Sequence, residues 1–324
     1  MNSLIKQQVT HGSEILRNGG VIAFPTETVY GLGARYDDPK AIQKIYDLKH
    51  RPADNPLIVH INDRNDLSSL VEFPIDSRLQ YLMDRFWPGP LTILLPKSAL
   101  VPEVVTAGLS TIAIRFPAHE ITRDLIDQVG VPLVAPSANP SGKPSATHHD
   151  HIAYYFEREI FCIEAGFTSV GLESTVVGID KGQVTIFRSG GITQENLSRC
   201  IEEEVPLFTS REYTPSPGMK YRHYAPEGQV IIIDTSDEIV DNNLGKAQGV
   251  IASEEFLAEI SPQSDVQKIS LGLRDNLADI STQVYHALYL ADYYQLEVIF
   301  VERFRREGLG QAIMDKFDKA SQEK

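Results

Sequence analysis

Short apolar runs alternate with helix-like segments along most of this chain, and that alternation restricts the possible folds more than any other feature. Near the start, residues 4–18 have helical spacing and residues 21–24 form an apolar run typical of a buried strand. Near the end, residues 229–234 and 297–302 are expected strands with helical segments between them. Such alternation predicts an α/β fold, with a small doubly wound parallel sheet in the C-terminal part.

A segment rich in proline and glycine interrupts the alternation at residues 205–228. Its prolines exclude regular structure, yet aromatic and cationic side chains are concentrated in it. We therefore expect an N-terminal domain over residues 1–204, a linker over residues 205–228 and a smaller domain over residues 229–324. The side chains that distinguish this linker from a plain spacer are Tyr213, Lys220, Tyr221, Arg222, His223 and Tyr224.

Composition excludes several classes of protein. The 324 residues suffice for two domains, and 30 Lys and Arg against 44 Asp and Glu give a net charge of −14. That charge argues against an extended nucleic-acid-binding surface, because such binding depends on Lys and Arg side chains that neutralise the phosphates. The apolar runs are shorter than the roughly 20 residues of a bilayer span, and we expect no signal peptide. Two cysteines cannot form a disulfide scaffold or a Cys-rich zinc site, so we expect a reduced, cytoplasmic setting.

Familiar nucleotide and hydrolase motifs are missing. Residues 141–144 lack the upstream glycine and the following hydroxyl residue of a Walker-type phosphate loop. Gly31 and Gly33 lack the third glycine of a dinucleotide fingerprint. The chain also has no Gly-x-Ser-x-Gly element, which disfavours an α/β hydrolase.

A histidine-rich segment begins at Thr147. Residues 147–150 are typical of a capping box, in front of a helix that we expect to run through Phe156. His148, His149 and His151 could ligate a metal, but histidines at a helix start without a clear set of acids are usually solvated. We therefore expect no metal site of the protein's own.

Cations at the ends of predicted elements are more informative. In the predicted strand 111–116, alternation places Thr111 and Arg115 on one face and the larger apolar side chains on the other. Arg188 ends a second apolar run, and Lys49 and Arg51 close the predicted helix 40–49. An arginine on an apolar strand either pairs with an acid or meets an anionic ligand, and the residues alone leave both readings open.

Taken together, several segments resemble the threonylcarbamoyl-AMP synthase family, in its long form with a YrdC-like domain and an added C-terminal domain. The matching segments occur in order and at the spacing of the family. They are residues 24–33, 49–51, 55–60, 87–92, 113–117, 135–139, 173–175, 187–190 and 216–226. The resemblance implies a twisted mixed-sheet α/β domain of the YrdC (DHBP synthase-like) type with a cationic cavity, followed by a smaller Rossmann-like α/β domain.

The same resemblance implies a two-step reaction. L-Threonine and bicarbonate form a carbamate, which attacks the α-phosphate of ATP and releases pyrophosphate. The product, threonylcarbamoyl-AMP, passes to a partner enzyme that modifies the tRNA adenosine next to the anticodon. Mg²⁺ is expected on the phosphates of ATP without a dedicated protein site, and direct tRNA contact is expected to be weak or indirect.

The resemblance also implies roles for individual residues. Those expected at L-threonine are Thr28, His60, Arg115, Ala135 through its backbone, and Ser174. Those expected at ATP are Arg51, Asn55, Thr111, Ser137, Ser145, Arg188 and Tyr221. The expected catalytic set is Lys49, Arg51, Ser137 and Asn139. The linker would cover the cavity as a lid and shield a hydrolysable adenylate from water.

Two other readings stay open at this point. A carbamoyltransferase of hydrogenase maturation carries a related domain, but it adds zinc-finger cysteine pairs that this chain lacks. The second reading is a non-catalytic tRNA-binding or regulatory module that uses the same cavity. The acidic net charge and the full set of cations speak against such a module.

Overall fold

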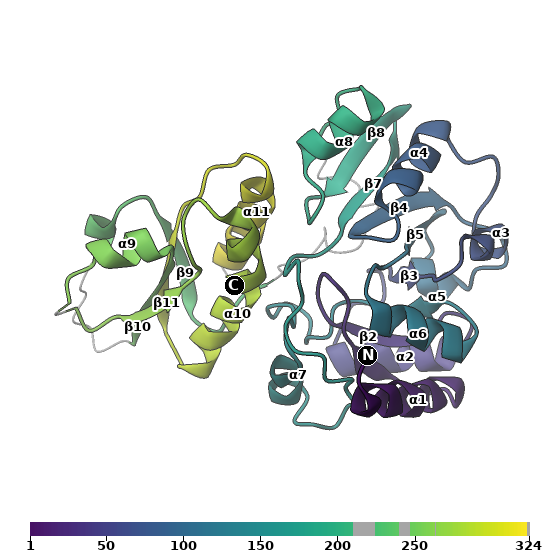
Figure 1. Cartoon of the computed structure of the whole chain (residues 1–324), viewed down its shortest axis with the longest axis horizontal. Helices are drawn as coiled ribbons and strands as arrows, with labels where there is room; N and C mark the ends of the chain where they lie inside the picture. The colour runs from purple at the N-terminus through teal and green to yellow at the C-terminus, as the bar shows by residue number, and fades with distance from the viewer. Residues whose placement is uncertain (210–223, 240–246, 263, 323–324) are drawn as a thin grey trace.

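The computed structural model describes residues 1–209, 224–239, 247–262 and 264–322, and these residues form two α/β units (Figure 1). The N-terminal unit contains an eight-stranded sheet in the order β1-β2-β6-β3-β5-β4-β7-β8. The C-terminal unit contains a four-stranded sheet in the order β11-β10-β12-β9. Among the described residues, no helix is both long and apolar enough to cross a membrane.

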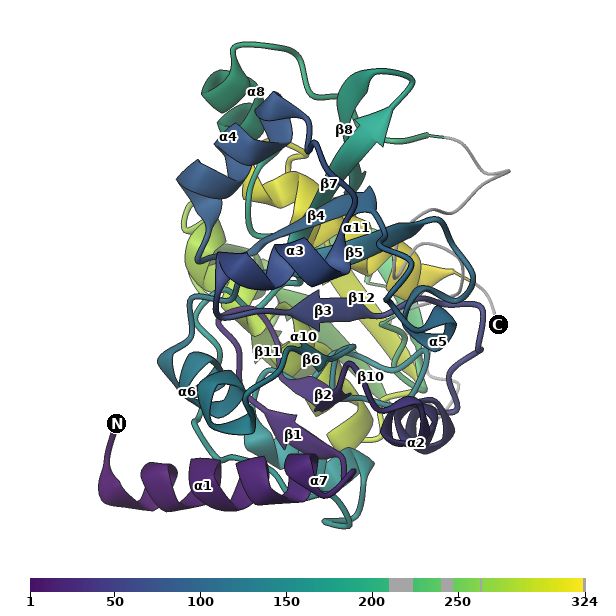
Figure 2. The same cartoon turned by 90° about the vertical axis from the view of Figure 1, so that its right-hand side faces the viewer.

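The eight-stranded sheet is mixed. β3 pairs with β5 and β4 with β7 in parallel, whereas its other pairings are antiparallel. In Figure 2 the strands follow one another from β1, next to α1, to β8, next to α8. The strands are β1 (Ile22–Phe24), β2 (Gly31–Arg35), β3 (Ile58–His60), β4 (Leu91–Pro96), β5 (Thr111–Arg115), β6 (Leu133–Val134), β7 (Thr175–Asp180) and β8 (Gln183–Arg188).

The helices of this unit form around the sheet because each has an apolar face. In α6, for example, Ile121, Leu125, Ile126 and Val129 are buried at helical spacing. The helices are α1 (Ser3–Arg17), α2 (Pro39–Lys49), α3 (Leu67–Leu70), α4 (Ser77–Phe86), α5 (Glu103–Thr106), α6 (Glu120–Val129), α7 (His149–Tyr155) and α8 (Gln194–Ile201), with a 3₁₀ turn η1 (Arg64–Asp66). Of these, α3, α5, α6 and α8 were not predicted from the sequence.

The C-terminal unit is a parallel sheet with helices, as predicted. All of its pairings are parallel. The strands are β9 (Gln229–Ile233), β10 (Gln248–Ala252), β11 (Gln267–Ser270) and β12 (Val298–Glu302). The helices are α9 (Glu254–Glu259), α10 (Leu277–Tyr293) and α11 (Leu309–Ser321), with a 3₁₀ turn η2 (Ser236–Glu238).

Strand β2 was missed because its glycines are more typical of a turn. The structure places Gly33 opposite Ile22 in the antiparallel pair of β1 with β2. A Cβ atom at Gly33 would lie 2.3 Å from the ring of Phe24. The glycine is therefore required by the packing of this aromatic ring across the two strands, not by a nucleotide phosphate.

The prediction of a capping box at Thr147 was wrong. Helix α7 begins at His149, and its N-cap is His148, whose Nδ1 accepts a hydrogen bond from the Asp150 amide at 3.3 Å. Thr147 is buried one residue earlier, and its amide donates to Nδ1 of His151 at 3.2 Å. The chain thus turns into the helix one residue later than the pattern indicated.

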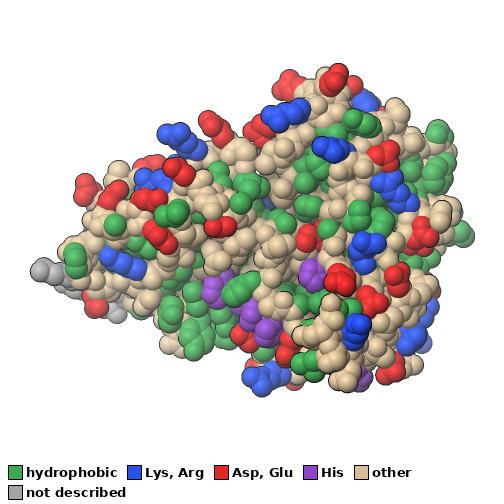
Figure 3. All heavy atoms as spheres, in the orientation of Figure 1, with side chains coloured by type: hydrophobic (Ala, Val, Ile, Leu, Met, Phe, Trp, Pro, Cys, Tyr) green, Lys and Arg blue, Asp and Glu red, His purple; other side chains and the backbone are tan. Residues whose placement is uncertain are grey.

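The two units share buried contacts. Val29 and Leu172 of the N-terminal unit belong to the same apolar cluster as Tyr285 and Leu288 of α10. Polar contacts also cross the junction: the Ser281 hydroxyl donates to the Val170 carbonyl at 2.9 Å. Histidine side chains gather where the units meet (Figure 3). The junction is therefore packed in the same manner as a protein core.

Candidate active site

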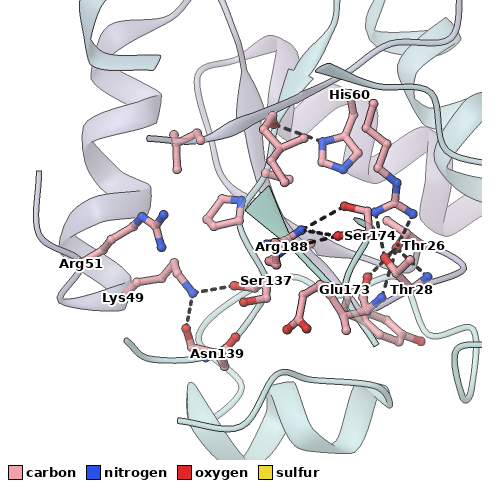
Figure 4. Close-up of a pocket in the computed structure, with 18 of the residues that line it drawn as sticks. Thr26, Thr28, Lys49, Arg51, His60, Ser137, Asn139, Glu173, Ser174 and Arg188 are labelled. Atoms are coloured by element: carbon pink, nitrogen blue, oxygen red, sulfur yellow. Dashed lines mark hydrogen bonds between the residues drawn. The ribbon is translucent and has the colours of Figure 1, made fainter. Parts of the chain in front are cut away.

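A cavity lies in the N-terminal unit next to the junction. Lys49 and Arg51 lie toward one end, Thr26 and Thr28 lie toward the other, and Arg188 lies between them (Figure 4). The described residues that line it are Thr26, Thr28, Val29, Tyr30, Gly31, Lys49, Arg51, Pro56, Leu57, Ile58, His60, Arg115, Ala135, Pro136, Ser137, Asn139, Ser141, Gly142, Glu173, Ser174, Arg188 and Tyr224.

Strand ends and helix ends bring these side chains together. β3 and β5 run in parallel with His60 opposite Arg115, so both strands end at the cavity. Arg188 ends β8, next to the first residues of β7. Lys49 ends α2, and His50 then adopts a left-handed conformation, with φ of 50°, that ends the helix. Segments far apart in the sequence thus share one hollow.

Charge in the cavity is opposite to that of the chain. Among the described residues, the lining includes the cations Lys49, Arg51, Arg115 and Arg188, but Glu173 alone carries a carboxylate. The net charge of the whole chain is −14. An anionic ligand would therefore be attracted to this hollow and repelled by much of the remaining surface.

Arg115 is buried and held from two sides. Its Nη2 lies 2.7 Å from Oε1 of Glu27, and its Nη1 donates to the Thr28 hydroxyl at 2.8 Å. Burial alone would raise the pKa of Glu27, but the Arg115 guanidinium holds it below its ordinary value. The pairing of Arg115 with an acid is thus confirmed, and its contact with an anionic ligand stays a prediction, since the same side chain also lines the cavity.

A threonine turn shapes the loop after β1. The Thr26 hydroxyl donates to the Val29 carbonyl at 2.6 Å and accepts from the amide of Thr28 at 3.1 Å. These bonds hold the loop in place and direct Thr28 toward Arg115. The sequence analysis assigned a role to Thr28 but not to Thr26.

His60 is a buried, neutral imidazole. Its Nδ1 lies 3.2 Å from the Ile58 carbonyl oxygen, so the neutral ring donates there and leaves Nε2 as an acceptor. Burial and the nearby Arg115 lower the pKa of His60 to about 3. At neutral pH this ring therefore offers an acceptor and not a positive charge.

Ser174 orients Arg188 in the middle of the cavity. Its hydroxyl lies 2.7 Å from that of Thr92, and it accepts a hydrogen bond from Nη2 of Arg188 at 3.0 Å. The Ser174 carbonyl also accepts from Nε and Nη2 of Arg188, at 3.1 and 2.9 Å. Arg188 is consequently fixed in direction by the segment before β7.

At the other end, Lys49 holds the loop after β6. Its amine donates to the carbonyls of Ser137, at 2.5 Å, and Asn139. Burial and the neighbouring Arg51 lower the pKa of Lys49 well below its ordinary value. Arg51 donates to the carbonyls of Asn55 and Pro56, at 3.1 and 2.9 Å. These bonds tie the cations to backbone on both sides of the hollow.

Asn139 presents an unused acceptor. Its amide nitrogen donates to the carbonyls of Pro140 and Lys143, both at 2.8 Å, which assigns the orientation of the amide. Its Oδ1 is buried and has no hydrogen-bond partner among the described residues. A buried acceptor left unpaired in a cavity wall is costly unless a ligand donates to it.

Most of the predicted site residues meet at the cavity. All of the residues expected at L-threonine and all of the expected catalytic set line it. Asn55 and Ser145 do not line it, although each contacts a lining residue: Asn55 accepts from Arg51, and Ser145 donates to Glu173 at 2.7 Å. Thr111 lies outside the lining, four residues before Arg115 in β5. Tyr221 and most of the predicted lid lie outside the described residues.

Sequence reasoning missed Glu27, Glu173 and Tyr224. Both acids belong to segments that were quoted for the family resemblance, but neither was given a role there. Tyr224 lines the cavity at the described end of the linker, and the next amide, of Ala225, donates to the Gly142 carbonyl at 2.8 Å. The aromatic content of the linker was the signal that could have identified Tyr224.

The histidine-rich segment lies apart from the cavity lining. Ligand atoms of His148, His149 and Asp150 lie within 4.8 Å of one another. The Nδ1 atom of His148, however, is engaged in capping α7. His151 stacks instead on Tyr289, with ring centroids 4.2 Å apart.

Comparison with known proteins relates both units to one group of enzymes. Residues 14–190 match the family described as Telomere recombination, and residues 192–322 match Threonylcarbamoyl-AMP synthase, C-terminal domain. The threonylcarbamoyl-AMP synthase of Pyrococcus abyssi is 40% identical, over 94% of this chain and 92% of its own length. That of Bacillus subtilis is 41% identical, over 97% and 93%.

Solved structures agree with these matches. The crystal structure of P. abyssi Sua5 complexed with L-threonine superposes with a TM-score of 0.87 at 40% identity, covering 97% of this chain and 94% of that one. Escherichia coli YciO, at 22% identity and a TM-score of 0.51, covers 57% of this chain and shares the fold alone. The match to Sua5 therefore extends over both units.

Proposed function

The chain belongs to the threonylcarbamoyl-AMP synthase family, and we propose that its cavity holds L-threonine and ATP next to each other. The activity is synthesis of threonylcarbamoyl-AMP for the threonylcarbamoyl modification of tRNA. L-Threonine and bicarbonate combine to a carbamate with loss of water. A carbamate oxygen then attacks the α-phosphorus of ATP, and pyrophosphate leaves.

We assign L-threonine to the end of the cavity that holds Arg115. The guanidinium suits a carboxylate, which it can bind through parallel hydrogen bonds. Hydroxyls at Thr28 and Ser174 can distinguish a hydroxyl-bearing amino acid from an apolar one, because buried polar groups left unpaired are costly. His60, as a neutral acceptor, and the Ala135 backbone complete the set.

We assign ATP to the end that holds Lys49, Arg51 and Ser137, with Arg188 reaching it from β8. Phosphoryl and nucleotidyl transfer need mainly positioning and neutralisation of charge, which these cations supply. ATP is expected to arrive with Mg²⁺ on its phosphates. The buried acceptor of Asn139 would take a hydrogen bond from a donor of the nucleotide or carbamate.

The remaining assignments are less direct. Asn55 and Ser145 would act through Arg51 and Glu173, which they contact. Thr111 and Tyr221 are proposed ATP contacts on the family resemblance, and the linker is a proposed lid. The product would be consumed by an enzyme that transfers the threonylcarbamoyl group to tRNA. The acidic net charge favours weak or indirect tRNA contact by this chain.

One observation carries the assignment. Cations from α2, β5 and β8 converge with hydroxyl groups on one hollow in a protein of net charge −14. An electrostatically matched ligand must carry an anionic group, and the two ends of the hollow suit two different anionic groups. The carboxylate of L-threonine and the phosphates of ATP meet both requirements.

The test is a reaction with L-threonine, bicarbonate, ATP and Mg²⁺, followed by pyrophosphate release and mass spectrometry of the product. We expect pyrophosphate only when threonine and bicarbonate are both present. Lys49→Met should abolish it. Lys44→Met, on the same helix, should not, because that amine donates to the Gly19 carbonyl away from the cavity. Bound ATP without pyrophosphate would favour the non-catalytic module.

A further inference from the structure

Glu173, the lone carboxylate among the described residues of the cavity lining, is held by the C-terminal unit. The hydroxyl of Tyr285, in α10, lies 2.7 and 2.6 Å from the two carboxylate oxygens of Glu173. The amine of Lys316, in α11, lies 3.8 Å from Oε2. From the N-terminal unit, Ser145 adds a second hydroxyl at 2.7 Å. All four side chains are buried, so these contacts are shielded from solvent.

The carboxylate is held in its charged form. Burial alone would raise the pKa of Glu173, but Lys316 and Arg188 together hold it below its ordinary value. Lys316 is itself fixed, because its amine pairs with Asp315 at 2.8 Å, donates to the Ser189 carbonyl at 2.9 Å and lies over the ring of Tyr224, 5.5 Å from its centroid. Tyr224 packs in turn on Tyr285, with centroids 5.2 Å apart.

The charged carboxylate of Glu173 could pair with Arg188 and so reduce the positive charge that Arg188 offers to a phosphate. Glu173 and Ser174 are adjacent in the chain, and Arg188 binds the carbonyl and hydroxyl of Ser174. Among the described residues, no ion pair joins Arg188 to Glu173, whose carboxylate pairs with Lys316 instead. If the carboxylate lost its present partners, Arg188 would remain as the cavity cation that acts on it, because Lys316 and Arg188 are the cations whose charges stabilise the ionised Glu173. A paired Arg188 would have less charge to offer to phosphate.

We propose that Tyr285 and Lys316 are positioning residues for the nucleotide, which keep the Glu173 carboxylate engaged so that Arg188 stays available to ATP. The C-terminal unit thereby completes a site whose lining belongs almost entirely to the N-terminal unit. This inference rests on the proposed assignment of Arg188 to ATP. It gives the second unit a defined part in the reaction.

The experiment compares KM values in the full-length protein. Lys316→Met and Tyr285→Phe should each raise the KM for ATP by about tenfold, which corresponds to about 1.4 kcal/mol. The KM for L-threonine should change less than about twofold, because Arg115 and Thr28 are unaffected. Equal changes in both KM values, or no change in either, would overturn the proposal.

A rescue separates positioning from general damage. Removing the charge by Glu173→Gln in the Lys316→Met background should return the KM for ATP toward that of the unmodified protein, since the uncompensated Glu173 carboxylate is gone and Lys319 still pairs with Asp315 at 3.0 Å. A merely structural role for Lys316 predicts no such recovery. If Lys316→Met does not fold, Tyr285→Phe with and without Glu173→Gln gives the same comparison with almost no change in volume.

Two controls complete the design. Ser281→Ala removes a different hydrogen bond across the junction, to Val170, and should leave the KM for ATP unchanged. Arg188→Ala tests the assignment on which the proposal rests. An unchanged KM for ATP in Arg188→Ala would refute that assignment. A raised value there, with normal values in Lys316→Met and Tyr285→Phe, would refute the role of the C-terminal unit alone.

Discussion

The guanidinium of Arg115 pairs with the buried Glu27 and also lines the cavity. Burying an ion pair costs desolvation, and removing one partner costs more, about 3–5 kcal/mol, because the other charge is left unpaired. Pairing with Glu27 fixes the guanidinium in direction, and the Thr28 hydroxyl fixes it further. The buried pair with Glu27 thus costs some folding stability but holds the Arg115 guanidinium in a fixed orientation for binding.

The corresponding prediction concerns ligand preference. Arg115→Ala should weaken binding of L-threonine more than binding of ATP, measured by calorimetry with each ligand. Because the single change leaves Glu27 unpaired, the double variant Glu27→Gln/Arg115→Ala should recover stability but not threonine binding. An equal loss of affinity for both ligands would contradict our placement of threonine at Arg115.

At the scale of elements, the first hairpin of the sheet depends on the absence of a side chain. β1 carries Phe24, whose ring lies against Gly33 of β2. This pair also borders the site, because the loop between the two strands contains Thr26 and Thr28, and Gly31 lines the cavity. The packing of one ring thus controls the position of a binding loop.

We predict that Gly33→Ala destabilises the protein, because a new Cβ atom would lie 2.3 Å from the Phe24 ring. Overpacking of this kind costs about 1–3 kcal/mol in the free energy of unfolding, measured by chemical denaturation. Phe24→Leu, which removes the ring, should cancel most of the added cost when both changes are combined. If the free-energy costs of Gly33→Ala and Phe24→Leu simply add in the double variant, the contact between residue 33 and the Phe24 ring is not the cause of the destabilisation.

Across the whole molecule, the junction of the two units is held partly by neutral histidines. Nε2 of His151 lies 3.0 Å from Nδ1 of His286, and Nδ1 of His151 accepts from the Thr147 amide. His148, Phe167 and Tyr289 pack against the same rings. A proton added to Nδ1 of His151 would turn this acceptor into a donor. It would then face the Thr147 amide, which is also a donor, and the hydrogen bond between them would be lost.

This arrangement predicts sensitivity to acid. Burial, and then the neighbouring His286, His148 and His149, lower the pKa of His151 to about 2, whereas an unfolded histidine titrates near about 6.5. The unfolded chain therefore binds more protons between these values, and the free energy of unfolding falls as pH drops below about 6.5. One such group contributes up to about 1.4 kcal/mol per pH unit.

Denaturation between pH 7 and pH 4.5 provides the measurement. We expect His151→Gln to lose stability less steeply with falling pH than the unmodified protein does. His11→Gln is the matched control, because the His11 side chain is 60% exposed and lies outside the junction. Identical slopes for His151→Gln and the unmodified protein would show that this histidine does not set the acid sensitivity.

The sequence by itself determined the α/β class, most of the strands and the main cations of the site. Strand alternation placed Arg115 on the strand face opposite the larger apolar side chains, and helix spacing placed Lys49 and Arg51 together at the end of α2. Ordered motifs then identified the family. These inferences succeed because periodicity and local chain stiffness depend on neighbours in the sequence.

Only the tertiary structure decided which groups meet. It paired Arg115 with Glu27, placed Thr111 outside the cavity lining, and set Tyr285 against Glu173 across 112 residues of chain. Periodicity indicates which face of an element is buried, but not which distant element covers that face. The partner of a buried charge depends on how the elements pack, and that packing is a property of the whole folded chain.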